Sequence, residues 1–483
     1  MAASTSTAVD SSAPPNSTTT SEGTSRTATP ASTSGANGAV VEKTPDDSSK
    51  LKTFLGILRR FMGVSDIAAV RFSLPAQLLE PTPNLEYWNY LDRPETFISI
   101  GDSEDPLGRM LGTLRFWFTK DLKYVKGKPC KPYNSTLGEF FRCNWEVEDT
   151  SPAIKSNKKD TPASSAASAI STASSGRTVK ISYLTEQTSH HPPVSAFWVD
   201  CPEKGISARG YDQISAKFTG TSIRVTPGAH NLGIFITLHR RDNEEYQLTH
   251  PAAHLGGLLR GSLSVSVADI CYITCPKTRI KVILHYLEEG WLGKTQNKVE
   301  GVIFTYDPEN DTKTKIKEVS DKDVLARIEG SWHDKIYYTI GSQAFSKNSV
   351  SRCLGQSETK QHLTSEKDKH LLIDVTPLTP VPKICPPEEQ QLPNESRRFW
   401  GKVTDAILSK QYSLATTLKQ ELEERQRQKA AERKTTGAEW NPRFFTGATS
   451  PAGRPDLTDE GRAALEKLRK DDWELEESKV YGA

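Results

Sequence analysis

The sequence lacks the features that tie a chain to a membrane or to an oxidising compartment. It has no run of about 18 apolar residues, so it offers no membrane-spanning helix. Its N-terminus has no basic segment followed by an apolar run, so no secretory signal is visible. Seven cysteines are scattered over 483 residues, and Cys271 and Cys275 form a C-x3-C with no second pair to complete a zinc site. We therefore expect reduced thiols in a cytoplasmic protein.

An excess of charge of one sign is also missing. Lysine and arginine total 62 and aspartate and glutamate total 60, which leaves a net charge of +2. A chain this balanced has neither the basic excess of nucleic-acid-binding proteins nor an acidic tail for a basic partner. We expect no nucleic-acid partner.

Two segments are too polar to form a core. Residues 1–50 consist mainly of Ser, Thr, Ala, Pro and Gly, which bury too little apolar area to offset the entropy of ordering. We predict a disordered low-complexity tail there. Residues 150–178 have a similar composition but lie between two strand-like runs, which predicts a mobile polar insertion within a domain.

The spacing of apolar residues changes twice along the rest of the chain. Leu51–Met62 has them at helical spacing, and a second helical region covers residues 84–124 with a break at the turn over 101–106. From about residue 145 to 341, apolar and polar residues alternate with a period of two. A helical pattern returns after residue 396. This order predicts an α+β fold, with helices before and after one large antiparallel sheet.

The most distinctive string is EQTSHHPP, residues 186–193, between two strand-like runs. Its adjacent imidazoles, His190 and His191, would point to opposite sides of an extended chain, so a local bend is needed for both to meet one ligand. Two imidazoles can donate hydrogen bonds to a phosphate. By itself, a His-His pair is more simply interpreted as part of a polar loop. A metal site would need a third ligand and a general base would need a nucleophile, and neither is found nearby.

The full octapeptide resembles the signature of the oxysterol-binding protein family, usually EQ-x-SHHPP. Residues 131–140, KPYNSTLGEF, are similar to the family's KP-x-NP-x-LGE-x-F segment, with Ser135 in place of the usual proline. The further landmarks are Gly210–Gln213, Gly330–Trp332, Leu392–Arg397, a closing helix around Lys419–Arg427, and Trp440–Phe445. The resemblance covers nearly the whole chain after residue 50.

This resemblance implies a particular architecture. One lipid-binding domain over residues 51–483 would form an incomplete antiparallel β-barrel that encloses a lipid tunnel. Residues 51–63 would form an N-terminal helical lid, and residues 396–483 a C-terminal helical region. Because residues 1–50 cannot fold into a membrane-targeting domain, the chain resembles the short fungal-type members that lack a pleckstrin-homology (PH) domain.

The resemblance also implies a set of binding residues. By position, the residues that would bind the phosphoinositide headgroup are Lys131, Asn134, His190, His191, Lys419, Glu423 and Arg427. Lysine, arginine, asparagine and protonated histidine are suitable donors to a phosphomonoester, and the i, i+4, i+8 spacing of the last three residues lines one helical face. Without the resemblance, that face would be a solvated row of salt bridges. Expected lid and tunnel contacts are Phe54, Leu58, Phe61 and Tyr124.

The expected function is lipid transfer rather than catalysis, with no cofactor and no metal. A monomer would carry one lipid at a time and exchange phosphatidylinositol 4-phosphate for a sterol. The lid and basic residues such as Arg59 and Arg60 would make transient contact with anionic membranes of the endoplasmic reticulum, Golgi or plasma membrane. Because Leu74–Pro81 is similar to relatives that carry phosphatidylserine, a phosphatidylserine exchanger is an alternative. A phosphoinositide sensor that does not transport lipid is another.

Overall fold

The computed structural model describes residues 47–70, 74–126, 131–152, 154, 156, 178–258, 263–287, 297–341 and 369–477. All described elements fall within Val41–Ala483, which forms one unit. The tail predicted over residues 1–50 lies almost entirely outside the described residues, as does most of the insertion predicted over 150–178. Both assignments therefore stay predictions.

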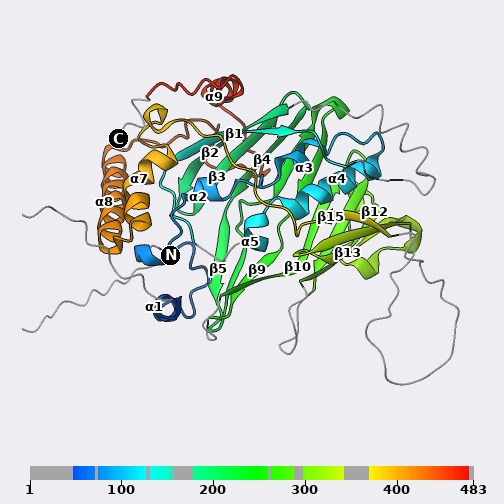
Figure 1. The fold of residues 1–483 in the computed structure, drawn as a ribbon, viewed down its shortest axis with the longest axis horizontal. Helices are drawn as coiled ribbons and strands as arrows, with labels where there is room; N and C mark the ends of the chain where they lie inside the picture. Colours follow the sequence, from blue (N-terminus) through cyan, green and yellow to red (C-terminus); the bar gives the residue numbers. More distant parts are fainter. Residues whose placement is uncertain are drawn as a thin grey trace, which may run out of the picture. The chain divides into compact units, whose positions relative to one another are not determined.

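In the described part of the chain, fifteen strands form one antiparallel sheet (Figure 1). Along the main path their order is β1-β2-β3-β4-β7-β8-β10-β11-β12-β13-β14-β15, while β5, β6 and β9 form a side branch that joins the sheet where β9 pairs with β10. The strands are β1 (Phe140–Glu148), β2 (Thr178–His190), β3 (Pro193–Cys201), β4 (Ile206–Asp212), β5 (Ile214–Phe218), β6 (Ile223–Pro227), β7 (Ile234–Leu238), β8 (Glu244–Leu248), β9 (Ala252–Gly256), β10 (Ser264–Cys275), β11 (Ile280–Tyr286), β12 (Lys298–Thr305), β13 (Val324–Ser331), β14 (Lys335–Ile340) and β15 (Lys369–Asp374). The predicted strand region is confirmed, although it begins earlier, at Phe140, and extends to Asp374.

The helices fall in two groups, before and after the strands. The first group is α1 (Asp47–Arg59), α2 (Asn84–Tyr87), α3 (Pro94–Ile98), α4 (Pro106–Thr119) and α5 (Leu122–Lys126), and the second is α7 (Ser396–Leu408), α8 (Tyr412–Thr436) and α9 (Asp459–Arg469). The break predicted at 101–106 is present, because Pro106 begins α4, but the helical region over 84–124 is divided more often than expected, in part because Pro94 begins a further helix. None of the described helices is both long and apolar enough to cross a bilayer.

The sheet is not closed. β1 and β15 stand at opposite ends of its main path, and no pairing joins them among the described strands. The chain between β15 and α7, residues 375–395, instead crosses to β1, and we call it the seam connector. Its Ile384 exchanges two backbone hydrogen bonds of 2.8 Å with Asn144 of β1. The predicted α+β fold with an incomplete antiparallel barrel is therefore confirmed.

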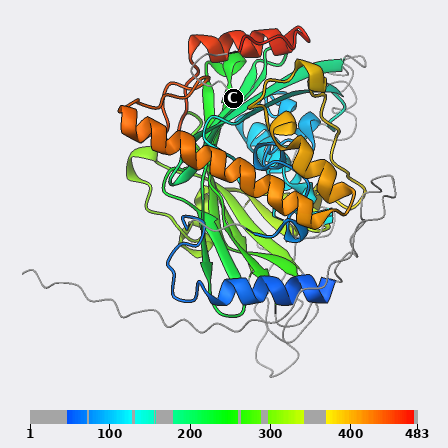
Figure 2. The same cartoon turned by 90° about the vertical axis from the view of Figure 1, so that its left-hand side faces the viewer.

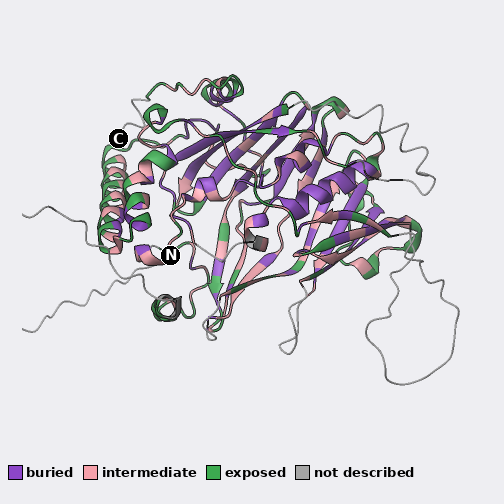
Figure 3. Ribbon diagram, viewed as in Figure 1, coloured by how far each residue is buried: buried purple, intermediate pink, exposed green. Residues whose placement is uncertain are grey.

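The largest apolar core lies between the sheet and helices α3 and α4. Figure 3 shows α4 and the central strands mostly buried. Phe97 of α3 and Phe116 of α4 pack with their ring centroids 5.5 Å apart. Trp145 of β1 and Ile328 of β13 belong to the same cluster, although they lie far apart in the strand order. Helices α3 and α4 therefore form part of the apolar core against the sheet.

The predicted lid helix lies on the side branch. α1 ends at Arg59, earlier than the predicted Met62, and a turn continues to Gly63, whose φ of 86° favours glycine. Its apolar face belongs to a cluster of Phe54, Leu58, Phe61, Phe218, Ile223 and Leu255. Figure 2 shows α1 across the lower ends of the strands and α8 above it. The helix thus covers the branch with its apolar side, as a lid would.

Candidate functional site

The histidine pair lies at the turn between β2 and β3. β2 ends at His190, and His191 and Pro192 form the turn, with a cis peptide bond between them. The pairing of β2 with β3 shifts between Gln187 and Ser189, where β2 contains an extra residue. The two imidazole centroids lie 4.6 Å apart. The bend that both rings need in order to meet one ligand is therefore present.

The first half of the octapeptide anchors this hairpin. Glu186 is 1% exposed, and its carboxyl group accepts hydrogen bonds from Arg443 N at 2.7 Å and Phe444 N at 2.8 Å. Trp440 Nε1 donates to Thr188 O at 3.2 Å. The aromatic segment after α8 therefore supports the hairpin, and only the second half of the octapeptide presents its side chains outward.

The Glu186 carboxyl makes the stability of this support depend on pH. Burial raises its pKa from the ordinary 4.5 to about 7, although the two backbone donors oppose the rise. Between pH 4.5 and about pH 7, the folded state keeps a proton on Glu186 that the unfolded state has lost. The free energy of unfolding therefore decreases as the pH rises towards 7. We expect the wild type to lose up to about 1.4 kcal/mol per pH unit relative to Glu186→Gln. Urea titrations of both proteins at several pH values test this expectation, and a pH-independent difference would contradict it.

Lys131 and Asn134 lie on the segment that leads into β1. Lys131 Nζ donates to Asn134 Oδ1 at 2.5 Å. The segment is fixed to α7, because the Tyr133 ring stacks on Trp400 with centroids 4.7 Å apart and the buried Glu139 carboxyl accepts from Trp400 Nε1 at 3.1 Å. A buried aromatic pair and a carboxyl group therefore hold these two candidates in place.

Lys419 and Glu423 of α8 act electrostatically on Lys131. Lys419 is 4% exposed and forms an ion pair of 2.8 Å with Glu423. Burial, and then the positive charge of Lys419, lower the pKa of Lys131 to about 8, while Glu423 opposes them. The three side chains are therefore neighbours. The charges of two ammonium groups and one carboxylate leave an excess of positive charge among these three side chains, which favours the binding of an anion.

Two backbone hydrogen bonds join the lysine segment to the histidine hairpin. Gly138 N donates to Gln187 O at 3.0 Å, and Gln187 N donates to Glu139 O at 2.8 Å. Gly138 has a φ of 78°, and a Cβ at this position would lie 2.6 Å from the Trp440 ring, so only glycine fits. The two halves of the candidate site are thus connected through Gln187, a residue of the octapeptide itself.

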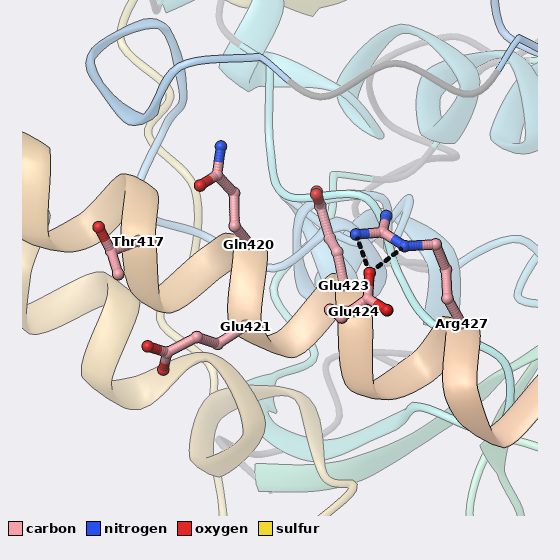
Figure 4. Close-up of a pocket in the computed structure, with 6 residues that line it drawn as sticks. All are labelled: Thr417, Gln420, Glu421, Glu423, Glu424 and Arg427. Carbon is pink, nitrogen blue, oxygen red and sulfur yellow. Dashed lines mark hydrogen bonds and ion pairs between the residues drawn. The ribbon is translucent and has the colours of Figure 1, made fainter.

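Arg427 does not pair with Glu423, the partner of Lys419, but with the neighbouring Glu424. Its guanidinium pairs with Glu424 at 2.8 Å, and its side chain is 57% exposed. Figure 4 shows this pair beside Glu423, in a shallow depression along α8. All the residues that line this depression belong to α8, so it is a groove between side chains of one helix rather than an enclosed cavity. The assignment of Arg427 to the headgroup site stays a prediction.

The predicted lid and tunnel residues are only partly described. Phe54, Leu58 and Phe61 lie together in the cluster on the side branch. Tyr124 is part of α5, but its side chain lies outside the described part of the structure. Its contact with a lipid stays a prediction.

A polar cluster inside the sheet was not expected from the sequence. Tyr90 donates to Asp212 Oδ1 at 2.5 Å, and its ring stacks on the His250 imidazole with centroids 5.5 Å apart. Lys120 Nζ lies 4.8 Å from the centre of the Tyr90 ring and 4.6 Å from that of Trp117. We call these five residues the interior cluster. The sequence signal that could have pointed to it is the Gly-Tyr-Asp-Gln landmark, which contains Asp212.

The interior cluster can exchange hydrogen bonds with a small polar group. Burial, and then the charge of Lys120, lower the pKa of His250 to about 3, so its imidazole is neutral. Its buried Nε2 has no hydrogen-bond partner among the described residues. Burial raises the pKa of Asp212 to about 7, against the hydrogen bond from Tyr90. A buried nitrogen without a partner is unfavourable unless water or a ligand satisfies it, so the cluster suits a ligand with one hydroxyl group.

Comparison with known proteins establishes the family. The sequence model of the oxysterol-binding protein family matches residues 53–478. The chain therefore belongs to the oxysterol-binding protein family, which confirms the resemblance of its motifs. Oxysterol-binding protein-like protein 1 of Schizosaccharomyces pombe is 42% identical over an alignment of 507 residues, which covers 90% of this chain and 94% of that protein. Oxysterol-binding protein-related protein 9 of Homo sapiens is 28% identical over 377 residues, which cover 77% of this chain and 44% of that protein.

Solved structures share the fold. The Osh1 ORD domain in complex with cholesterol superposes with a TM-score of 0.61 at 19% identity, covering 91% of this chain and 93% of that one. The Osh3 ORD of Saccharomyces cerevisiae in complex with PI(4)P has a TM-score of 0.55 at 17% identity, covering 87% of this chain and 93% of that one. At this identity the likeness concerns the fold, and the bound lipids belong to those two proteins.

Proposed function

We propose that this protein transfers lipids between membranes by exchanging phosphatidylinositol 4-phosphate for a sterol. The observation that carries the proposal is that the ammonium groups of Lys131 and Lys419 lie near each other, while Glu423 forms its ion pair with Lys419. A phosphomonoester carries nearly two negative charges and would offset the repulsion between the two ammonium groups. Membership in the oxysterol-binding protein family, and the PI(4)P complex of the Osh3 ORD, support this choice of anion.

The neighbouring hairpin would complete the headgroup site. The adjacent rings of His190 and His191 offer N–H donors to the phosphate, and a phosphate favours their protonation. Asn134 offers an amide donor once Lys131 turns from it to the phosphate. Glu423 can accept hydrogen bonds from inositol hydroxyls while it orients Lys419. In this arrangement the phosphate has several donors, and the inositol ring has an acceptor in Glu423.

A sterol would use the interior cluster instead. A sterol has one hydroxyl group at the end of a rigid apolar body, and the cluster presents His250 Nε2 and the Tyr90–Asp212 pair within an apolar core. The cholesterol complex of the Osh1 ORD supports a sterol as the second lipid. Because both lipids need the same apolar interior for their hydrophobic parts, binding of one excludes the other, and this competition makes exchange possible.

The test is a two-vesicle assay. Donor vesicles contain a fluorescent sterol, and acceptor vesicles contain either phosphatidylinositol 4-phosphate or phosphatidylinositol. We expect the protein to move sterol faster towards acceptors that contain the 4-phosphate, and to carry the phosphoinositide in the opposite direction. Countertransport of phosphatidylserine alone would assign the second lipid to the alternative suggested by Leu74–Pro81. Binding of the phosphoinositide without acceleration of any transfer would leave a sensor in place of a carrier.

The lid should control how long the lipid is retained. Leu58 of α1 is 1% exposed against the side branch, so Leu58→Ala should weaken lid packing by about 2 kcal/mol or more. If the lid must stay docked to retain lipid, this corresponds to loss of bound sterol about 30 times faster. The measurement is the rate at which labelled sterol leaves the protein for an excess of empty vesicles. Met62→Ala is the matched control, because Met62 is 58% exposed; equal rates for the two variants would contradict the lid assignment.

Membrane contact in this proposal is transient and peripheral. Arg59 and Arg60, at the end of α1, are exposed and can interact with anionic lipids beside the lid. In this proposal the protein is a cytoplasmic monomer that visits the surfaces of the endoplasmic reticulum, Golgi or plasma membrane.

A further inference from the structure

Two thiols face each other where the seam connector crosses β1. The two backbone hydrogen bonds between Asn144 and Ile384 make these residues a hydrogen-bonded antiparallel pair. The next pair along the strands is Cys143 and Cys385, which is consequently a non-hydrogen-bonded pair with both side chains on the same face. Both residues pack against the main apolar core, which agrees with this orientation.

This position has the geometry that a disulfide needs. Cα atoms of a non-hydrogen-bonded antiparallel pair lie about 4.5 Å apart, within the range of about 4.4 to 6.8 Å found for disulfide-linked residues. The two thiols lie close enough for each to shift the pKa of the other. Both are present as free thiols in the structure. Forming the bond therefore requires little movement of the backbone.

The two cysteines differ in their exposure and in the pKa of their thiols, so each suits a different step of an oxidation. Cys385 is partly exposed, whereas Cys143 is fully buried. The hydrogen bond from Cys143 lowers the pKa of Cys385, and the charges of Arg397 and Lys383 also favour the thiolate. Burial raises the pKa of Cys143 well above its usual value. Cys385 is thus the thiol that an oxidant would meet first, and Cys143 is placed to react with the product.

We infer that Cys143 and Cys385 form a site of reversible oxidation by peroxides. The Cys385 thiolate attacks the peroxide oxygen, which yields a sulfenic acid and releases the other oxygen as water or alcohol after protonation. The Cys143 sulfur then attacks the sulfenic sulfur, forms the S–S bond and releases a second molecule of water. Two thiols lose two electrons and two protons, and the peroxide gains them. Thiol-based reductants reverse the reaction.

The disulfide would fix the open edge of the sheet. It would tie the seam connector covalently to β1 and close a loop that contains every strand from β2 to β15. A loop of this length is the case in which a cross-link restricts the unfolded chain most strongly. Oxidation is therefore expected to raise the melting temperature of the lipid-free protein by about 2–6 °C, since the entropy of unfolding grows with the size of the folded unit. This inference does not depend on the identity of the transported lipids.

The experiment uses the full chain, treated with hydrogen peroxide and then with an alkylating agent. We expect peptide mapping under non-reducing conditions to identify a Cys143–Cys385 linked pair, which dithiothreitol removes. Cys143→Ser and Cys385→Ala should each abolish the linked pair and the rise in melting temperature. Cys201→Ser is the matched control, because Cys201 is also buried, and burial raises its pKa to about 11. This control should still form the linked pair.

Two results would overturn the inference. One is oxidation of Cys385 to a sulfinic acid while Cys143 stays reduced. The other is a disulfide that joins Cys385 to Cys130 or Cys353, both of which lie outside the described residues. If Cys143→Ser does not fold, Cys385→Ala gives the same test at a position that is partly exposed.

Discussion

The double variant His190→Ala/His191→Ala is expected to bind phosphatidylinositol 4-phosphate at least about 100-fold more weakly than the wild type. Each imidazole would donate a charge-assisted hydrogen bond to the phosphate, and such bonds contribute about 1.5–3 kcal/mol each. The hairpin itself should stay folded, because Glu186 and Thr188 hold it through Arg443, Phe444 and Trp440. The measurement is extraction of the labelled phosphoinositide from vesicles at several protein concentrations.

Sterol extraction separates a binding role of the histidines from a folding role. The interior cluster contains neither histidine of the pair, so the double variant should extract sterol as the wild type does. Arg425→Ala is the matched control, since it removes one exposed positive charge from α8 without changing a residue assigned to the site. Loss of both lipids in the double variant would mean that the histidines support the fold. Equal loss of phosphoinositide binding in Arg425→Ala would mean that general charge, not the hairpin, attracts the lipid.

The order of helices and strands could be predicted because it depends on local patterns. A period of two along one chain segment requires a strand with one buried face, and the apolar spacing of Phe54, Leu58 and Phe61 requires a helix with one apolar side. Where a helix begins also depends on local sequence when a proline is its first residue, as at Pro94 and Pro106. Which surface the lid helix covers could not be predicted in this way, because the side branch is assembled from strands that are separated in sequence.

The site could be predicted only where its residues share a motif. The octapeptide pointed to the histidine pair, but the same eight letters did not show that Glu186 is buried and supports the hairpin while His191 is exposed. Within the interior cluster only Asp212 belongs to one of the recognised motifs, because Tyr90, Lys120 and His250 come from three separate segments that the fold brings together. In sequence each looks like an ordinary polar or aromatic residue. Its significance comes from burial, which depends on the whole fold.

We expect the substitution with the largest effect on stability to lie where β1 meets the seam connector. Arg142 of β1 and Glu395 of the connector form an ion pair at 3.1 Å whose side chains are 0% and 2% exposed. Arg142 Nη2 also donates to Trp473 O at 2.7 Å. Arg142→Met would leave the Glu395 carboxylate buried without its cation, which is expected to lower the free energy of unfolding by about 3–5 kcal/mol. The melting temperature should fall by about 3–6 °C, measured without lipid and under reducing conditions.

A second substitution shows whether the uncompensated charge causes this loss. Glu395→Gln in the Arg142→Met background removes the charge and keeps the shape, so it should recover about half of the lost stability or more. Burial already raises the pKa of Glu395, with Arg142 opposing it, so loss of Arg142 should raise it further. Arg142→Met should consequently regain stability relative to the wild type as the pH falls and the carboxylate is protonated. Arg462→Met, which breaks the exposed pair with Asp459, is the control and should change stability by less than about 1 kcal/mol. One outcome would contradict this account: the double variant is no more stable than Arg142→Met, and the stability of neither variant relative to the wild type changes with pH. In that case the packing of the arginine side chain and its hydrogen bond to Trp473, not the ion pair, stabilise the seam.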